Sequence, residues 1–339
     1  MSSLRLGTRA SLLARTQAEG VAQRLRQAGH AVELVPMTSD GDRTSASLST
    51  LGGTGVFAAA LRQALLEGRC DLVVHSYKDL PTAAHPGLSV AAVPARADHR
   101  DALCSPVPLD ELPAGARVGT GSPRRRAQLL AMRPDLDVVD IRGNIDTRLR
   151  LVADGEVAAV VLAVAGLQRI GRMAALSAIF EHPTAPAQGA LAVEVRSDDG
   201  QVAARVGGLD HGPTRRAVEL ERAILAGVEA GCAAPLAVSA TPISPELPDG
   251  VVGAGGLAVE AVAYRPDGGA QVSVRRLAPS AGSGGAGSGG SGGAGSAGSG
   301  GAGGSGGAGG ADLGSQIPLL ASQITEELLA AGIGGWLHP

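Results

Sequence analysis

The amino-acid sequence predicts an α/β protein with two similar α/β units followed by a smaller α+β region. Strand-like and helix-like segments alternate along most of the chain, a pattern typical of helices packed on largely parallel sheets. The pattern restarts near residues 98–102, which indicates a second unit of similar build. From about His211 it changes to a helix, strands and a final helix. The 339 residues are enough for two or three domains of ordinary size.

Short apolar runs separated by amphipathic stretches define the expected elements of the two α/β units. Gly29 is expected to end the first helix, and Pro123 suits the first position of a later one. In the first unit we expect strands at 4–7, 31–37 and 71–75 and helices at 11–28 and 56–66. In the second unit we expect strands at 117–119, 137–141 and 158–163 and a helix from 123 to about 132.

The last region contains two expected strands, at 251–264 and 271–277, and a final amphipathic stretch at 317–329. Between them, residues 282–310 contain only Gly, Ser and Ala, a composition that cannot form a core. We therefore expect a disordered insertion at 280–311. The entropy cost of closing a loop rises only slowly with its length, so a domain tolerates such an insertion.

Composition argues against several classes of protein. The 29 basic residues are 28 arginines and one lysine, Lys78, so no GxxxxGK[ST] phosphate-binding loop occurs. A net charge of −3 and 1% aromatic residues argue against nucleic-acid binding. No apolar run reaches the ~18 residues of a membrane span, and the first residues lack signal-peptide features. We expect a cytoplasmic protein with reduced thiols and, without CxxC or HExxH motifs, no metal site.

The segment from Val73 to Pro81, VVHSYKDLP, places polar side chains directly after an apolar strand. Ligands of open α/β sheets bind outside the carboxyl ends of the strands, where Lys78 and Asp79 are expected to lie. The lysine could anchor an anionic substrate, and the carboxylate could act beside a reacting centre. His75 is expected to pack beneath this loop. The alternative is a solvated strand end without a catalytic role.

The segment GTGSPRRR, from Gly119 to Arg126, predicts an anion site at the start of a helix. Ser122 is a good N-cap, and the free N–H groups of a helix N-terminus attract negative charge. Arginines in the first turn oppose the helix dipole, which indicates an acidic ligand or partner. A second basic stretch, from Ile141 to Arg150, follows. A solvated arginine face is the alternative; nucleic acid fits less well because aromatic residues are lacking.

Three cysteines, odd in number and widely spaced, make a disulfide framework unlikely. Cys70 and Cys104 have the surroundings of small buried hydrophobic residues. Cys232 differs because it lies in an expected loop, from Glu229 to Pro235, with turn residues on both sides. A cysteine in a loop is more available for reaction or covalent attachment.

Taken together, eight motifs in this order resemble the porphobilinogen deaminase family, whose members are also called hydroxymethylbilane synthases. The resemblance spans residues 4 to about 277 and resumes in the last helix, and only the Gly/Ser/Ala insertion is foreign to it. The motifs are TRASLLA from Thr8, VHSYKDLP, DHRDA from Asp98, GTGSPRRR, IRGNIDTRL, LAVAGLQRIG, AQGA from Ala187 and the GC loop at Cys232.

The resemblance implies three domains, the first two built like periplasmic binding proteins with the active site between them. Domain 1 would comprise residues 1–95 and 188–208, and domain 2 residues 98–185. Domain 3, at 211–339, would be a smaller α+β domain that carries the cofactor-attachment cysteine.

The resemblance also implies an enzyme that joins four porphobilinogen molecules head to tail, releases ammonia, and hydrolyses linear hydroxymethylbilane free for tetrapyrrole biosynthesis. A dipyrromethane cofactor would be attached by a thioether to Cys232, and Asp79 would be the catalytic carboxylate. The implied protein is a monomer whose product passes to uroporphyrinogen-III synthase. Positions matching cofactor-binding residues are Lys78, Asp79, Ser122, Arg124 and Arg125, and positions matching substrate-binding residues are Arg9, Ser11, Phe57, Arg142, Arg148, Arg169 and Gln188.

Two competing interpretations remain open. A solute-binding module of the same architecture would bind anions but would have no use for Cys232 or for Asp79 beside Lys78. A Schiff-base enzyme would use Lys78 as its nucleophile. The chain also departs from the family, because Thr54 and Ala59 stand where members often carry lysines, which leaves two substrate-side charges missing.

Overall fold

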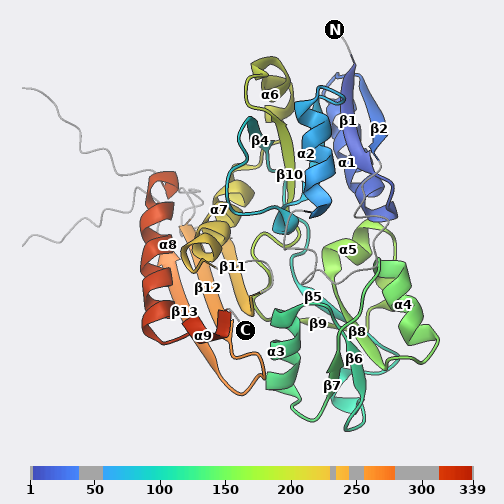
Figure 1. Ribbon diagram of the computed structural model, residues 1–339, viewed down its shortest axis with the longest axis vertical. Helices are drawn as coiled ribbons and strands as arrows, with labels where there is room; N and C mark the ends of the chain where they lie inside the picture. Colours follow the sequence, from blue (N-terminus) through green and yellow to red (C-terminus); the bar gives the residue numbers. More distant parts are fainter. Residues whose placement is uncertain (1–2, 38–55, 230–233, 244–255, 279–312, 338–339) are drawn as a thin grey trace, which may run out of the picture.

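The computed structural model describes residues 3–37, 56–229, 234–243, 256–278 and 313–337. It contains two five-stranded sheets and a three-stranded sheet. Figure 1 shows the two larger sheets one above the other, with the third sheet beside them. Within the described residues, no helix is long and apolar enough to cross a membrane.

The first sheet has the strand order β2-β1-β3-β10-β4. Its inner strand β1 is parallel to β2 and β3, whereas β10 runs antiparallel to both β3 and β4. The strands are β1 (Leu4–Arg9), β2 (Val32–Met37), β3 (Leu72–Ser76), β4 (Leu88–Ala92) and β10 (Leu191–Arg196), and the helices are α1 (Leu12–Gln27), α2 (Val56–Leu66) and α6 (Gly200–Gly207).

The second sheet repeats this topology with the order β7-β6-β8-β5-β9. Here β6 is parallel to β7 and β8, and β5 runs antiparallel to β8 and β9. The strands are β5 (Asp101–Cys104), β6 (Arg117–Gly119), β7 (Asp137–Val139), β8 (Ala159–Ala163) and β9 (Ala178–Phe180), and the helices are α3 (Pro123–Met132), α4 (Ile145–Ala153) and α5 (Val164–Arg169). Short 3₁₀ turns lie at Tyr77–Asp79, Leu109–Glu111 and Met173–Ala175.

The third sheet is an antiparallel meander that packs one face against helices. Its core contains Val238 and Leu257 from the sheet, Ile224 from the first helix, and Ile324 and Leu328 from the second. The strands are β11 (Leu236–Ile243), β12 (Gly256–Tyr264) and β13 (Gln271–Ala278), and the helices are α7 (Gly212–Gly227), α8 (Leu313–Ala330) and α9 (Gly334–Leu337).

Two segments connect the five-stranded sheets, residues 93–100 after β4 and residues 181–190 after β9, and we call them the crossover segments. They pass very close to each other. Gly189 has φ +85°, and a Cβ placed there would lie 2.6 Å from the carbonyl oxygen of Ala97. Only glycine fits this position, because it tolerates positive φ and lacks the colliding carbon.

The predicted fold class is confirmed, and α2, β6 and α3 occupy the predicted ranges. In each larger sheet four of the five strands run in one direction, as expected. Only β10 and β5 run antiparallel to their neighbours, and neither strand was predicted. Strands β4, β9 and β11 were also not predicted. The Gly/Ser/Ala insertion at 280–311 lies outside the described residues. From the sheet membership we propose the domain division at 1–95 with 188–208, 98–185 and 211–339.

Candidate active site

Lys78 and Asp79 lie in the 3₁₀ turn directly after β3, at the carboxyl end of that strand, as predicted. Asp79 is exposed and Lys78 is partly buried. Helix α7 holds the turn from the third sheet's side: Arg222 donates to the carbonyl oxygens of Leu80 at 2.9 Å and Pro81 at 2.5 Å. Its guanidinium also stacks 4.4 Å from the centre of the Tyr77 ring. The turn is therefore fixed on a rigid helix, which favours a precise position for the Asp79 carboxylate.

Gln188, in the second crossover segment, joins this turn to the second sheet. Its Oε1 accepts from Lys78 Nζ at 3.1 Å and from Arg125 Nη2 at 3.3 Å. Its Nε2 donates to Asp101 Oδ1 at 2.8 Å and to the carbonyl oxygen of His99 at 2.7 Å. The side chain is fully buried, so its four hydrogen bonds fix the two sheets against each other at this point.

Arg124 and Arg125 share a carboxylate partner, Asp101, at the start of β5. Arg125 Nη2 lies 2.6 Å from Asp101 Oδ1, and Arg124 Nη2 lies 2.8 Å from Asp101 Oδ2. All three side chains are buried. Burial alone would raise the pKa of Asp101, but the two guanidiniums hold that pKa well below its ordinary value. We call Asp101, Arg124, Arg125 and Gln188 the Asp101 cluster.

Four cations in this region have lowered pKa values, and one of them is Arg124, where burial outweighs the charge of Asp101. The pKa of Lys78 falls to about 8, chiefly because of burial and then because of the charge of Arg125. The pKa of Arg148 falls to about 10 through burial and the charges of Arg125 and Arg142. The pKa of Arg169 also falls to about 10, through burial and the charge of Arg24. A lowered cation pKa marks a place where added negative charge is stabilising.

Two of these cations, Arg148 and Arg169, are positioned by main-chain contacts. Arg148 Nε donates to the carbonyl oxygen of Gly143 at 2.9 Å, and Arg169 Nη2 donates to that of Gly189 at 2.7 Å. Among the described residues, neither arginine forms an ion pair with a carboxylate. Arg142 does, because its Nη2 lies 3.2 Å from Asp140 Oδ2.

The serines predicted as ligand residues act as helix caps. Ser122 Oγ accepts from the backbone N–H of Arg125 at 3.4 Å at the start of α3, and Ser11 Oγ accepts from that of Ala14 at 3.4 Å at the start of α1. Arg9 ends β1, beside β3, and so lies at the same sheet edge as Ser76 and the turn that follows it. Each cap satisfies a backbone N–H group in the first turn of its helix, α1 in the first unit and α3 in the second.

Two predicted residues cannot be placed here. Cys232 lies outside the described residues. Phe57 lies within α2, but its side chain is not among those described. Sequence reasoning missed the roles of Asp101, which lies within the DHRDA motif, and of Arg222, for which the sequence carries no local signal. His75 is buried as predicted, with Nε2 3.0 Å from Glu194 Oε2.

The donor set fits a group that carries several carboxylates. Lys78, Arg148 and Arg169 all have pKa values lowered by burial, and the charge of Arg125 adds to the effect at the first two. Added carboxylates would relieve this repulsion, whereas a neutral ligand would not. Among the described residues no cluster of His, Cys, Asp or Glu could hold a metal ion.

Comparisons with known proteins agree with this chemistry. The family model described as porphobilinogen deaminase, dipyrromethane cofactor binding domain, matches residues 4–204, more than half of the chain. The porphobilinogen deaminase of Leifsonia xyli subsp. xyli is 54% identical over 286 residues, covering 81% of this chain and 84% of the relative. That of Thermobifida fusca is 56% identical over 239 residues, covering 68% and 75%.

Among solved structures, the methionine-binding protein MetQ covers 65% of this chain and 93% of its own, with 15% identity and a TM-score of 0.41, a distant likeness on which no assignment rests. The matching family model and the identity to curated relatives over most of both chains are decisive. This chain belongs to the porphobilinogen deaminase family, a family of enzymes with a dipyrromethane cofactor.

Proposed function

We propose that this chain is a transferase that condenses four porphobilinogen molecules head to tail, with release of ammonia, and then releases linear hydroxymethylbilane by hydrolysis for tetrapyrrole biosynthesis. The observation that carries the proposal is the exposed Asp79 carboxylate next to Lys78, whose pKa is lowered, together with Arg148 of the second unit, whose pKa is lowered as well. A substrate with an acetate, a propionate and an aminomethyl group needs both kinds of group: cations for its carboxylates and a carboxylate for its reacting centre.

The residues present fit a dipyrromethane, and we propose that Cys232 carries it. When bound, the dipyrromethane supplies the pyrrole to which the first substrate is joined. Lys78 and Ser122 are proposed to face its carboxylates. Arg124 and Arg125 are proposed to act there while Asp101 keeps both guanidiniums in place. Among the described residues, Arg124 Nε has no hydrogen-bond partner, whereas Arg125 Nη1 donates to the carbonyl oxygen of Val161.

The protein's own part in the reaction follows from the turn after β3. We propose that Asp79 accepts hydrogen bonds from pyrrole N–H groups and stabilises the positive charge that develops as ammonia leaves the substrate. Arg222 and Gln188 keep Asp79 and Lys78 at fixed positions from opposite sides. Arg9, Ser11, Arg142, Arg148, Arg169 and Phe57 are proposed to bind substrate.

The wider setting is also proposed. We infer that the enzyme works as a monomer in the cytoplasm. We propose that the linear product passes to uroporphyrinogen-III synthase. Neither nucleic acid nor a membrane is proposed as a partner.

The first experiment is the intact mass of the purified protein under denaturing conditions. A mass increase of two pyrrole units in the wild type, absent from Cys232→Ser and retained in the matched variant Cys104→Ser, would support the thioether. An unmodified wild type is incubated with porphobilinogen and measured again. If no adduct and no ammonia form, the enzyme proposal is wrong and a binding module remains. A substrate trapped on Lys78 by borohydride would instead favour the Schiff-base alternative.

A further inference from the structure

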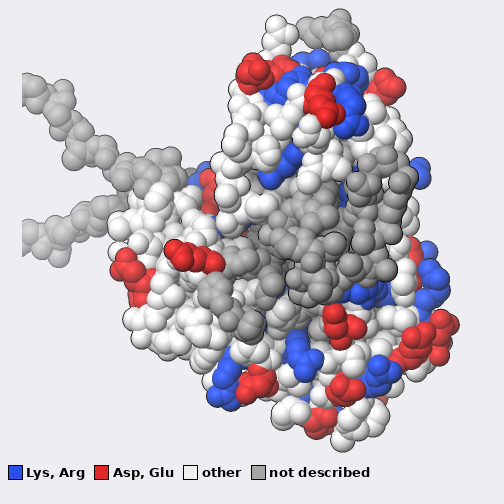
Figure 2. All heavy atoms as spheres, viewed as in Figure 1, with Lys and Arg blue, Asp and Glu red and all other residues white. Residues whose placement is uncertain are grey.

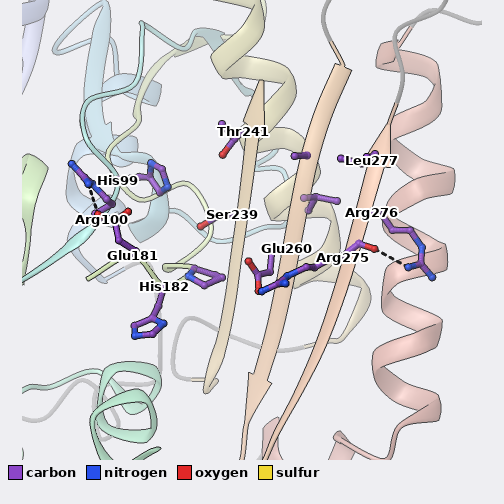
Figure 3. Close-up of a pocket in the computed structure, with 13 residues that line it drawn as sticks. His99, Arg100, Glu181, His182, Ser239, Thr241, Glu260, Arg275, Arg276 and Leu277 are labelled. Carbon is purple, nitrogen blue, oxygen red and sulfur yellow. Dashed lines mark hydrogen bonds and ion pairs between the residues drawn. The ribbon is translucent and has the colours of Figure 1, made fainter. Parts of the chain in front are cut away.

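A cavity of about 460 Å³ lies away from the proposed active site, between the crossover segments and the third sheet. Ser239 and Thr241 of β11, Glu260 of β12 and Arg275 of β13 line one wall, on the sheet face opposite the α7 and α8 core (Figure 3). None of the residues proposed above to bind cofactor or substrate lines it. It is large enough for a small-molecule ligand.

The two walls are joined at the base of the cavity by backbone contacts. The N–H of Thr184 donates to Ser239 Oγ at 3.0 Å, and the N–H of Val238 donates to the carbonyl oxygen of Thr184 at 2.8 Å. The cavity thus has a fixed base and walls from two different parts of the fold. A ligand in it would touch both the second crossover segment and the third sheet.

Each wall carries one ion pair. On the crossover wall, Arg100 Nη1 lies 2.5 Å from Glu181 Oε1, and on the sheet wall, Arg275 Nη2 lies 2.7 Å from Glu260 Oε1. The Glu181 side chain is 74% exposed and that of Arg275 is 77% exposed. Exposed pairs of this kind contribute only about 0–1 kcal/mol, so a ligand group can replace one partner at little cost.

The remaining partners are held independently. Arg100 also donates to Asp98 through Nε and Nη2, at 3.1 and 2.8 Å, so it keeps a carboxylate when Glu181 turns away. Glu260 Oε1 likewise accepts from the hydroxyl of Ser273 at 3.4 Å. Glu181 can therefore meet a ligand cation while Arg100 stays paired with Asp98. Arg275 can meet a ligand anion while Glu260 keeps the hydroxyl of Ser273 and its contact with solvent.

We propose that this cavity binds a small zwitterion, a molecule with a primary ammonium and a carboxylate separated by a short apolar spacer. Glu181 receives the ammonium, Arg275 receives the carboxylate, and the side chains of Ala258 and Leu277 contact the spacer. Arg276 has no part in recognition although it lines the cavity, because its guanidinium is paired with Glu327 of α8 and points away (Figure 3). His99 offers no positive charge there, because burial lowers its pKa.

Simple probes test the charge pattern without any turnover. Ligand-observed NMR titration would compare 6-aminohexanoate with hexanoate and hexylamine, which each keep one charged group. We expect 6-aminohexanoate to bind about two- to fivefold more tightly than either, because it gains the second ion pair. Equal affinity of hexanoate or hexylamine, or no binding of the zwitterion, would overturn the proposal.

Variants locate the binding. Glu181→Gln and Arg275→Gln should each weaken 6-aminohexanoate binding about fivefold, and the matched variant Arg276→Gln should change it less than twofold. An unchanged affinity in both of the first two variants contradicts the site. Thermal melting confirms that each variant is folded, which is expected because all three side chains are at the surface.

Two sources could supply such a ligand, and competition separates them. Porphobilinogen itself carries a primary amine and carboxylates. It is therefore titrated into the complex of the protein with 6-aminohexanoate, and release of 6-aminohexanoate is followed. Displacement in the wild type but not in Glu181→Gln assigns the cavity to the substrate, as a second site that rests on the proposed function. Without displacement, the cavity belongs to an amino-acid-type zwitterion. Failure of the proposed function leaves the 6-aminohexanoate result unchanged.

Discussion

Arg125 and Arg148 both follow parallel strands of the second sheet, yet their electrostatic surroundings are opposite. Arg125 lies in the Asp101 cluster and has a buried carboxylate 2.6 Å from its Nη2. Arg148 donates to a backbone carbonyl, and burial with neighbouring positive charge lowers its pKa to about 10. Figure 2 shows acidic and basic side chains mixed over the face of the molecule drawn there.

The comparison separates two functions that arginine serves in one site. In the Asp101 cluster a carboxylate faces both guanidiniums, although burial still lowers the pKa of Arg124. Gln188 links Arg125 and Asp101 to the first sheet. At Arg148, Arg169 and Lys78 the positive charge is destabilised in the protein without ligand. The first group builds the site, and the second is prepared for the carboxylates of a ligand.

The largest effect is expected from Asp101→Asn. Removing this charge leaves two buried guanidiniums without a carboxylate, which should lower the free energy of unfolding by about 3–5 kcal/mol. Urea denaturation measures this loss of unfolding free energy, with Asp140→Asn as the matched control. Asp140 pairs with Arg142 at the surface, so its loss should cost less than about 1 kcal/mol. Similar losses in the two variants would remove the distinction between the Asp101 cluster and a surface pair.

Arg148→Gln should show the reverse pattern. It removes a partly buried charge without an ion-pair partner among the described residues, so the free energy of unfolding should change by less than about 1 kcal/mol. Losing a charge-assisted contact to substrate of about 1.5–3 kcal/mol should lower kcat/KM for porphobilinogen about 10- to 150-fold. Arg125→Gln, measured beside it, should lose stability as well as activity. A large stability loss in Arg148→Gln with unchanged kcat/KM would show a structural role instead.

The pKa of Lys78 predicts a pH-dependent binding step. In the folded protein this pKa is about 8, below the ordinary value of 10.5, so the protonated form opposes folding. That cost is fully present below pH 8 and is relieved as the pH rises from about 8 to 10.5, because the unfolded chain then binds more protons than the folded one. A bound carboxylate raises the pKa of Lys78. Ligand binding near pH 8 should therefore be accompanied by the uptake of at most about half a proton per protein molecule.

Calorimetry in two buffers of different ionisation enthalpy measures this uptake, with porphobilinogen added to Asp79→Asn so that turnover does not interfere. Adding Lys78→Arg to that background should abolish the uptake and keep the charge, since arginine does not titrate in this range. Uptake that persists in the double variant assigns the proton to another group.

The sequence contained enough local signal for several of these elements. Pro123 and Ser122 predict the start of α3, and an apolar run before Lys78 and Asp79 predicts their place at the end of β3. The pairing of Asp101 with Arg125 could not be predicted, because their spacing along the chain says nothing of how β5 is oriented. For the same reason the contact of Arg222 with Leu80, across two units, has no local signature.

The sheets illustrate the same limit. Each α/β unit contains three parallel strands that alternation with helices predicts, and a fourth and fifth strand that it does not. Strands β5 and β10 follow crossover segments, and their antiparallel direction is set by a chain that returns from the other sheet. The direction of β5 and β10 depends on how the two units pack together. Hydrophobic periodicity within a short stretch of sequence therefore cannot predict it.

The smallest effect concerns Ser122, which the family resemblance assigns to the cofactor and the structure shows capping α3. As a cap alone, Ser122→Ala should cost about 1 kcal/mol of unfolding free energy and Ser122→Gly only a few tenths, because glycine is tolerated at the N-cap. As a ligand contact, both variants lack the hydroxyl and should lose the same affinity for porphobilinogen. Urea denaturation and KM for the two variants therefore give independent readings of the two roles. If both variants keep the KM of the wild type but differ in unfolding free energy, Ser122 has a structural role like that of the Asp101 cluster. If the KM rises equally in both variants, Ser122 contacts the ligand, as proposed for Arg148.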